Sequence, residues 1–128
     1  MCLNKRGFTL IELLVSISIL SVVFLGLFKA LYASIDYNMV NMLRAEGVTY
    51  GDEIMTQEML KPFAAISTNT RTYTSTRAIA LAFKSFSATR TNVAESTNTT
   101  SVQINVRWQY KGIPYSHSVS SMVTNPNQ

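Results

Sequence analysis

The chain begins with a long apolar stretch. No charged residue occurs from Leu13 to Phe28, and the apolar run that starts at Phe8 and ends at Phe28 would be roughly 31 Å long as a helix. That length matches the hydrocarbon core of a bilayer, and a single span satisfies its backbone hydrogen bonds only as a helix. The pattern therefore predicts a membrane-spanning helix over residues 8–28.

Two basic residues, Lys5 and Arg6, lie directly before this span. Positive charges beside a span hold that end of the chain in the cytoplasm. Lys29 opposes this orientation weakly from the other end, but its long side chain can reach the membrane interface. We expect a single-pass membrane protein with its N-terminus in the cytoplasm and its C-terminal part outside.

Apolar residues continue beyond the span at three- and four-residue steps. They are Leu27, Leu31, Ile35, Met39, Met42 and Leu43. This spacing is typical of a helix with one apolar stripe. Gly47 and Gly51 weaken the pattern by about 1 kcal/mol each relative to alanine, and Pro62 stops it. We therefore predict an amphipathic continuation over residues 29–61, which bends near the glycines, ends near Leu60 and lays its stripe on a globular head.

The head, residues 62–128, has the pattern of a small β-rich domain. Apolar residues alternate with polar ones along residues 102–110, which predicts a half-buried antiparallel strand. Lys111 and Gly112 predict a turn, and evenly spaced apolar residues from Ile113 onward complete a hairpin that covers the helix. The predicted fold class is α+β, with a long N-terminal helix packed on a small antiparallel sheet.

The topology between residues 63 and 100 stays open, because serine, threonine and asparagine dominate it. One apolar island at residues 78–83 interrupts this region. Six residues do not separate a strand from a short helix, but the surrounding threonines favour a strand.

Few residues suit catalysis or metal binding. His117 is the only histidine and Cys2 the only cysteine, so a histidine-based metal cluster and an internal disulfide are both excluded. No phosphate-binding loop or nucleophile elbow occurs. We predict no enzyme activity, no cofactor and no metal site. Asp52, Glu53 and Glu58 are interpreted as a solvated helix face, and His117 as a surface or edge-strand residue.

The formal net charge is +4, and loss of Lys5 and Arg6 would lower it by two. That balance gives nucleic-acid binding little support. Five basic residues of the head could still form a basic surface. They are Arg71, Arg77, Lys84, Arg90 and Arg107. A membrane-anchored protein that binds DNA or another surface is therefore kept as an alternative.

One carboxylate, Glu12, lies within the apolar stretch. A charge there costs about 2.5–3.5 kcal/mol at the centre of a span and less near an end, and a plain anchor has no use for it. If the chain were cut before Phe8, the new α-amine would be positive. Glu12, one helical turn away, could then pair with the amine of a neighbouring subunit.

Residues 5–15 read Lys-Arg-Gly-Phe-Thr-Leu-Ile-Glu-Leu-Leu-Val and resemble the type IV prepilin processing motif almost residue for residue. The resemblance implies that residues 1–7 are a leader, which prepilin peptidase removes by cutting between Gly7 and Phe8. It also implies N-methylation of Phe8 and a role for Glu12 in assembly. The implied partners are other pilin or pseudopilin subunits, the peptidase and an inner-membrane assembly platform. The implied location is the bacterial inner membrane, with the head on the periplasmic side, and after assembly the pilus or pseudopilus.

The C-terminal strand pattern resembles that of PilV-type minor pilins and related pseudopilins. Many major pilins close this region with a disulfide, which the single Cys2 does not allow here. We therefore expect a structural subunit, a minor pilin of a type IV pilus. A type II secretion pseudopilin and a competence pseudopilin remain alternatives.

Overall fold

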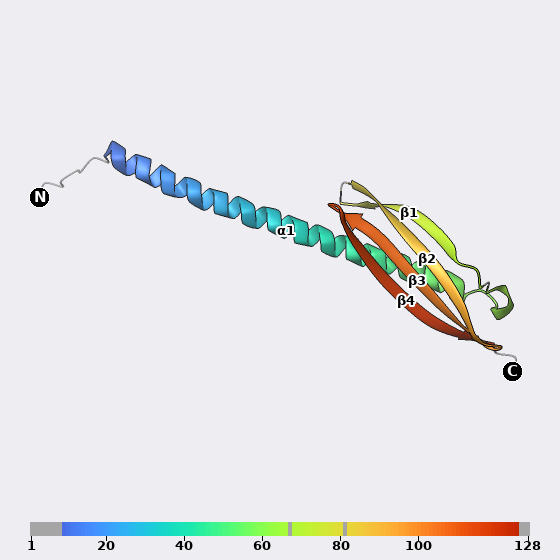
Figure 1. The fold of residues 1–128 in the computed structure, drawn as a ribbon. Coiled ribbons are helices and arrows are strands. Elements are labelled where there is room, and N and C mark those ends of the chain that lie inside the picture. Colours follow the sequence, from blue (N-terminus) through green and yellow to red (C-terminus); the bar gives the residue numbers. More distant parts are fainter. Residues whose placement is uncertain (1–8, 67, 81, 126–128) are drawn as a thin grey trace, which may run out of the picture. The chain divides into compact units, whose positions relative to one another are not determined.

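The computed structural model describes residues 9–66, 68–80 and 82–125 of the 128-residue chain. It contains a helix α1 (Leu10–Met59), a 3₁₀ helix η1 (Phe63–Ala65) and the strands β1 (Arg71–Ile79), β2 (Ala82–Ser96), β3 (Thr99–Tyr110) and β4 (Ile113–Thr124), all shown in Figure 1. The strands form one antiparallel sheet in the order β1-β2-β3-β4. This confirms the predicted α+β class, and the arrangement is pilin-like.

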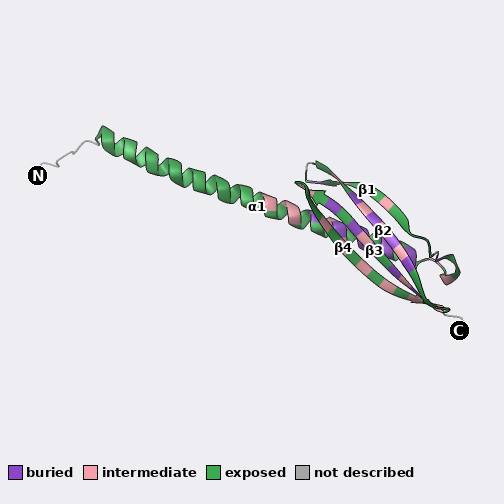
Figure 2. Cartoon of the chain, in the orientation of Figure 1, coloured by how far each residue is buried: buried purple, intermediate pink, exposed green. Residues whose placement is uncertain are grey.

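The chain divides into two units, Met1–Met39 and Val40–Gln128. In the first unit, every residue from Thr9 to Ile35 is exposed, as the green part of α1 in Figure 2 shows. Residues Leu13 to Phe28 of this unit carry no charge. By length and composition, α1 is therefore the one helix in the described part of the chain that could cross a membrane.

In the second unit, one face of α1 packs on the sheet. Its buried residues recur at three- and four-residue steps and are Leu43, Gly47, Tyr50, Gly51, Ile54, Met55 and Glu58. Of the predicted apolar stripe, Leu43 is buried, whereas Leu27, Leu31 and Ile35 in the first unit are exposed. The same periodicity continues through both units, but only the second unit contains a sheet that can cover it.

Gly47 and Gly51 lie on the buried face of α1, and the helix continues through both. A Cβ atom on Gly47 would lie 2.6 Å from Cζ3 of the Trp108 ring, and one on Gly51 would lie 3.2 Å from Cγ2 of Val106. The glycines therefore let β3 approach the helix closely. Gly51 also faces Val119 of β4, so the predicted hairpin does cover the helix.

Strand β3 has the predicted alternation. Val102, Ile104, Val106 and Trp108 are buried, and the polar residues between them are not. Lys111 and Gly112 both have positive φ, 49° and 80°, and join paired residues Tyr110 and Ile113. Positive φ at both central residues is the geometry of a two-residue hairpin turn, which confirms the predicted turn.

The apolar island at residues 78–83, for which the surrounding threonines favour a strand, contributes to two strands, β1 and β2. Ile79 at the end of β1 pairs with Ala82 at the start of β2, so the island contains a chain reversal. Ala80 has a φ of 50°. Glycine or asparagine ordinarily marks such a position, and because alanine occupies it here, the sequence carries no turn signal.

Replacing Gly47 by alanine is expected to destabilise the head by about 1–3 kcal/mol, the usual cost of overpacking a core. This cost outweighs the gain of about 1 kcal/mol in helix propensity, because the ring of Trp108 is buried and cannot move aside. Urea unfolding of the full chain in detergent micelles, followed by fluorescence of the single tryptophan, measures the change. Gly26→Ala is the matched control, since no atom lies within 4 Å of its added Cβ. Equal stability of the two variants would contradict the proposed close approach.

Candidate functional site at the start of helix α1

Helix α1 starts with a reciprocal pair of residues, Thr9 and Glu12. The backbone N–H and the hydroxyl of Thr9 donate to Glu12 Oε2 at 3.3 Å and 3.2 Å, and the backbone N–H of Glu12 donates to Thr9 Oγ1 at 3.4 Å. This is a capping box, which satisfies backbone donors at the helix start. Sequence reasoning missed Thr9, although the Thr-x-x-Glu spacing before an apolar run is its signal.

The capping box places Glu12 at the first turn of α1, where the helix dipole favours a negative charge. The neighbouring side chains Ile11, Leu13 and Leu14 are 68%, 52% and 52% exposed, so the carboxylate lies on an apolar surface. Within the described part of the chain, its second oxygen, Oε1, accepts no hydrogen bond and stays open to another group. The other predicted site residues, Lys5, Arg6, Gly7 and Phe8, lie outside the described residues.

The serines within the apolar part of α1 are satisfied by the helix itself. The hydroxyls of Ser16, Ser18 and Ser21 donate to the carbonyl oxygens of the residues four positions earlier, each at 2.8 Å. A polar group in lipid costs free energy unless it is hydrogen-bonded. These bonds make the serines compatible with the predicted span and leave Glu12 as its one charged side chain.

The head contains a buried ion pair that the sequence did not indicate. Glu58 on α1 is 1% exposed and Arg90 on β2 is 4% exposed, and Arg90 Nη1 donates to Glu58 Oε2 at 2.9 Å. Lys61 Nζ and the hydroxyl of Tyr73 donate to Oε1 at 2.5 Å and 3.2 Å. Burial alone would raise the pKa of the Glu58 carboxyl, but the hydrogen bonds from Lys61 and Arg90 outweigh it, so that pKa lies below its ordinary value.

The interpretation of Glu58 as part of a solvated face is therefore wrong. Position 58 follows Ile54 and Met55 by four and three residues, so it falls on the buried face of α1. Its partner Arg90 is 32 residues away in the sequence, and no local pattern connects the two.

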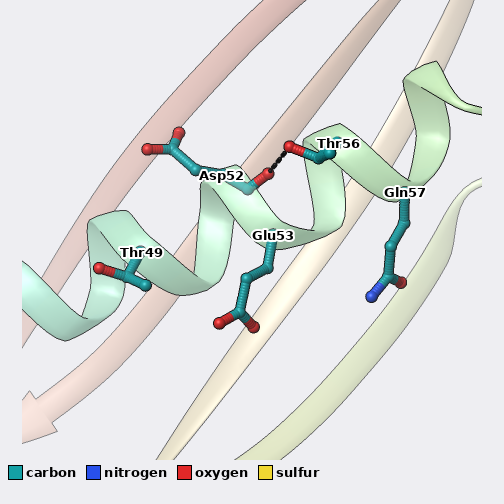
Figure 3. Close-up of a pocket in the computed structure, with 5 residues that line it drawn as sticks. All are labelled: Thr49, Asp52, Glu53, Thr56 and Gln57. Carbon is teal, nitrogen blue, oxygen red and sulfur yellow. Dashed lines mark hydrogen bonds between the residues drawn. The ribbon is translucent and has the colours of Figure 1, made fainter.

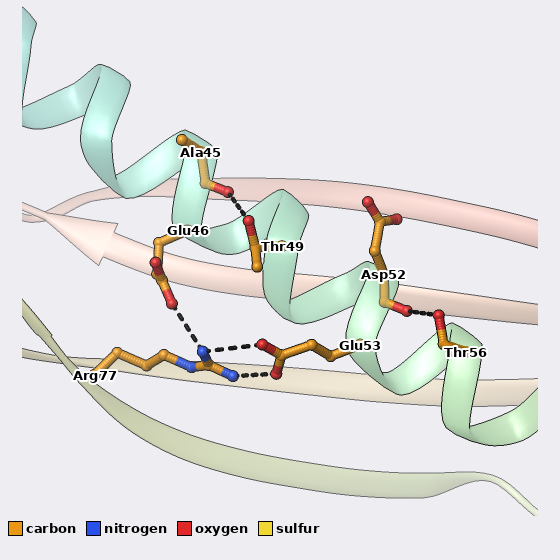
Figure 4. Close-up of polar contacts among 7 residues, drawn as sticks. All are labelled: Ala45, Glu46, Thr49, Asp52, Glu53, Thr56 and Arg77. Carbon is orange, nitrogen blue, oxygen red and sulfur yellow. Dashed lines mark hydrogen bonds and ion pairs between the residues drawn. The ribbon is translucent and has the colours of Figure 1, made fainter.

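Arg77 on β1 forms a second ion-pair cluster with α1, shown in Figure 4. Its Nη1 donates to Glu46 Oε1 at 3.0 Å, and both of its terminal nitrogens donate to the Glu53 carboxylate. The guanidinium also lies 5.0 Å from the centre of the Tyr50 ring. The hydrogen bond to Glu53 raises the pKa of Arg77 more than its partial burial lowers it.

Two of the five residues of the predicted basic surface therefore do not contribute a free positive charge. Arg77 and Arg90 are neutralised by carboxylates of α1. Arg71 lies over the Tyr73 ring and Lys84 over the Tyr110 ring, and Arg107 donates to Asn105. The sequence could not show this, because the carboxylates that pair with the two arginines lie on another element.

The exposed side of α1 in the head has an open hollow, which Figure 3 shows from outside. Thr49, Asp52, Glu53, Thr56 and Gln57 line it. Its threonine hydroxyls donate to helix carbonyls, that of Thr49 to Ala45 at 3.0 Å and that of Thr56 to Asp52 at 2.8 Å. Glu53 is held by Arg77. In this hollow the threonine hydroxyls therefore contact backbone carbonyls and not the carboxylates.

Residues 9–66, 68–80 and 82–125 contain no group of side chains that could bind a metal ion. Within these ranges no three histidine, cysteine, aspartate or glutamate side chains lie close enough together to hold an ion. His117 lies half-buried on the edge strand β4, with its Cδ2 3.8 Å from the position of a Cβ on Gly51. This agrees with the edge-strand role that its sequence position indicated.

Comparison with known proteins points to the N-terminal part of the chain. Residues 2–28 match the family model of the prokaryotic N-terminal methylation motif. The chain thus carries this motif at the start of a pilin-like α+β fold. The motif implies processing by prepilin peptidase, an inner-membrane anchor formed by the apolar helix, and assembly with other pilins, which is a structural role rather than an enzymatic one. No curated protein and no solved structure gives a significant match.

The ion pair of this pilin-like head yields a prediction on pH. Because the folded-state pKa of Glu58 lies below the unfolded value of about 4.3, its stabilisation is complete above that value and disappears as the pH falls through the folded-state pKa. Glu58→Gln should remove this part of the pH dependence and lower stability at neutral pH by about 3–5 kcal/mol, since Arg90 is left buried and unpaired.

Urea unfolding of the full chain in micelles, at neutral pH and at several acidic values, tests this expectation. Glu53→Gln is the matched control, because its carboxylate is 46% exposed in its ion pair, and exposed pairs contribute about 1 kcal/mol or less. If Glu58→Gln proved no more destabilising than Glu53→Gln, the central role of the buried pair would be disproved.

Proposed function

We propose that this protein is a minor pilin of a type IV pilus, cut between Gly7 and Phe8 and methylated at Phe8. The observation that carries the proposal is the match of residues 2–28 to the methylation motif. Lys5 and Arg6 would hold the leader on the cytoplasmic side, where prepilin peptidase acts. The apolar part of α1 would serve first as the membrane anchor and then as the filament core.

The exposed apolar surface of α1 supports this second role. Side chains point outward on all sides of the helix from Thr9 to Ile35, so the helix requires lipid or other helices around it. A bundle of identical helices provides the same apolar surroundings as lipid. Removal of the subunit from the membrane would then cost little, provided that its one charged side chain finds a partner.

Glu12 is this charged side chain, and it can find a partner in the helix bundle. Within one subunit, Thr9 donates only to Oε2 of Glu12. Oε1 can therefore accept a hydrogen bond from the methylated α-amine of the preceding subunit. Attraction between opposite charges grows as the surrounding dielectric constant falls. The pairing would therefore be strongest between subunits whose helices are already packed, and it would set their register.

The small head supports the minor-pilin assignment, because it contains no internal disulfide. The one cysteine of the sequence is Cys2. A type II secretion or competence pseudopilin shares these features and is the alternative. A DNA-binding role is disfavoured by a specific observation, the pairing of Arg77 and Arg90 with carboxylates of α1.

Co-expression with a prepilin peptidase should yield a chain that begins with N-methylphenylalanine at Phe8. Intact mass and N-terminal sequencing measure both changes. Gly7→Val should leave the chain uncut, because a branched side chain would stand at the cleavage position. An uncut wild-type chain beside an active peptidase and a processed control pilin would refute the proposal and leave a plain anchored domain.

Glu12→Val should leave cleavage intact and abolish incorporation into filaments, because the α-amine of the neighbouring subunit then has no partner in the helix bundle. Immunoblots of sheared filaments measure incorporation, and a minor pilin should appear there in small amounts relative to the major subunit. Asp52→Val, which removes an exposed carboxylate from the same helix, is the control and should incorporate normally. Normal incorporation of Glu12→Val would exclude charge pairing.

A further inference from the structure

Two hairpin tips lie at the same end of the sheet. One joins β1 to β2 and the other joins β3 to β4 (Figure 1). The ammonium of Lys84, close to the first tip, lies 5.7 Å from the centre of the Tyr110 ring, and that of Lys111 in the second tip lies 5.6 Å from it. One aromatic ring therefore brings the two tips together. We call residues 79, 80, 82–84 and 110–113 the tip surface.

Each tip exposes a large apolar side chain. Phe83 is 79% exposed and Ile113 is 55% exposed. Single exposed apolar residues are common on protein surfaces. Here, however, two of them lie in neighbouring turns, beside the same two ammonium groups.

The charges of the tip surface are all positive. Residues 79–84 and 110–114 include two lysines and no carboxylate. The carboxylate of Glu46, which borders a hollow together with Ala78 and Ala80, is paired with Arg77 at 3.0 Å. Apolar side chains combined with basic ones are the combination that binds the headgroup region of an anionic bilayer.

A second pair of exposed apolar residues on the sheet has a different setting. Val93 and Met122 pair with Ser101 from either side, at the other end of the sheet. Ser101 donates to Glu95 Oε1 at 3.0 Å, and residues 91–103 and 118–125 contain no lysine or arginine. Because anionic lipid repels a carboxylate, this second pair does not suit a bilayer surface, whereas the tip surface does.

Helix α1 enters the head beside the tip surface. Its Gly47 lies against Trp108, two residues before Tyr110, whereas Glu58, near the end of α1, bonds to Arg90 further along the sheet. Residues 29–39, which separate the predicted span from the head, cover roughly 17 Å as a helix. This short connection keeps the tip surface within reach of the bilayer that holds the span.

We propose that the tip surface docks on the anionic headgroups of the membrane in which the chain is anchored. In the docked head, Lys84 and Lys111 contact lipid phosphates. Phe83 and Ile113 insert below them, and the ring of Tyr110 lies at the interface, where tyrosine is enriched. Docking holds the head of the unassembled precursor on the membrane. It needs the anchor but neither processing nor assembly, so its failure would leave the proposed function untouched.

The test uses the full chain, one copy per bilayer disc, with nitroxide-labelled lipid headgroups that quench a nearby fluorophore. Cys2→Ser removes the native thiol, and Ala82→Cys places the fluorophore on the tip surface. Thr97→Cys carries it instead on the exposed turn between β2 and β3, at the opposite end of the sheet. Time-resolved fluorescence separates docked from undocked heads. In discs rich in phosphatidylglycerol, quenching should be strong at position 82 and weak at position 97, and it should weaken at position 82 in discs of phosphatidylcholine alone.

Lys84→Gln with Lys111→Gln should lower the ratio of docked to undocked heads roughly tenfold or more, because each lysine at an anionic surface contributes about a factor of five. The matched control is Arg71→Gln with Arg107→Gln, which removes the same charge from exposed positions outside the tip surface. This control should dock like the wild type. High salt should lower the ratio for the wild type as well, since it screens exposed charges.

Far-ultraviolet circular dichroism and fluorescence of Trp108 establish that each variant is folded, and the salt series on the wild type tests the charges without any substitution at the tips. The proposal is overturned if heads dock equally on phosphatidylglycerol and phosphatidylcholine, or if salt leaves docking unchanged. It is also overturned if the lysine variant docks as well as the arginine control, or if position 82 is quenched no more than position 97.

Discussion

A helix whose apolar side chains are exposed on every side cannot remain in water, and this constraint governs the rest of the structure. The N-terminal part of α1 makes its backbone hydrogen bonds internally, and its serines bond to its own carbonyls. From Leu10 to Phe28, Glu12 is the one charged side chain. Lipid and a bundle of similar helices satisfy the same requirement, so one segment can serve in both places. Glu12, which forms the capping box with Thr9 at the helix start, is the exception. In the proposed bundle it can pair with a neighbouring α-amine, whereas lipid offers no such partner.

In the head, the same helix is held by close packing and by ion pairs. Gly47 and Gly51 remove the side chains that would separate α1 from β3, so the Trp108 ring lies directly against the helix backbone. The Phe86 ring lies 5.8 Å from the ring of Trp108 and 6.5 Å from that of Tyr50. Further along α1, the buried pair of Glu58 and Arg90 fixes the helix end to β2. A buried pair contributes little net stability but strongly disfavours any arrangement that separates its charges.

Much of the fold could be predicted because it depends on local periodicity. The alternation along residues 102–110 placed the buried residues of β3 correctly, and the turn at Lys111 and Gly112 followed from its residue types. The apolar stretch could be recognised because no charge interrupts it from Leu13 to Phe28. The hairpin between β1 and β2 could not be predicted, since its chain reversal uses Ala80 in a conformation that alanine rarely adopts. The threonine-rich strands on either side carry few apolar residues by which to recognise them.

By itself, the sequence determined the properties that depend on neighbouring residues: the apolar helix, the processing motif around Gly7 and Phe8, the unusual position of Glu12 and the clearest strand. Only the tertiary structure decided which polar residues are free. Glu58 and Arg90, which look like solvated charges, are buried together, and Arg77 is bound by two glutamates of α1. The threonines and serines that look like loop residues form one face of a sheet instead. The physical reason is that pairing and burial depend on contacts between elements distant in sequence, which the strand register brings together.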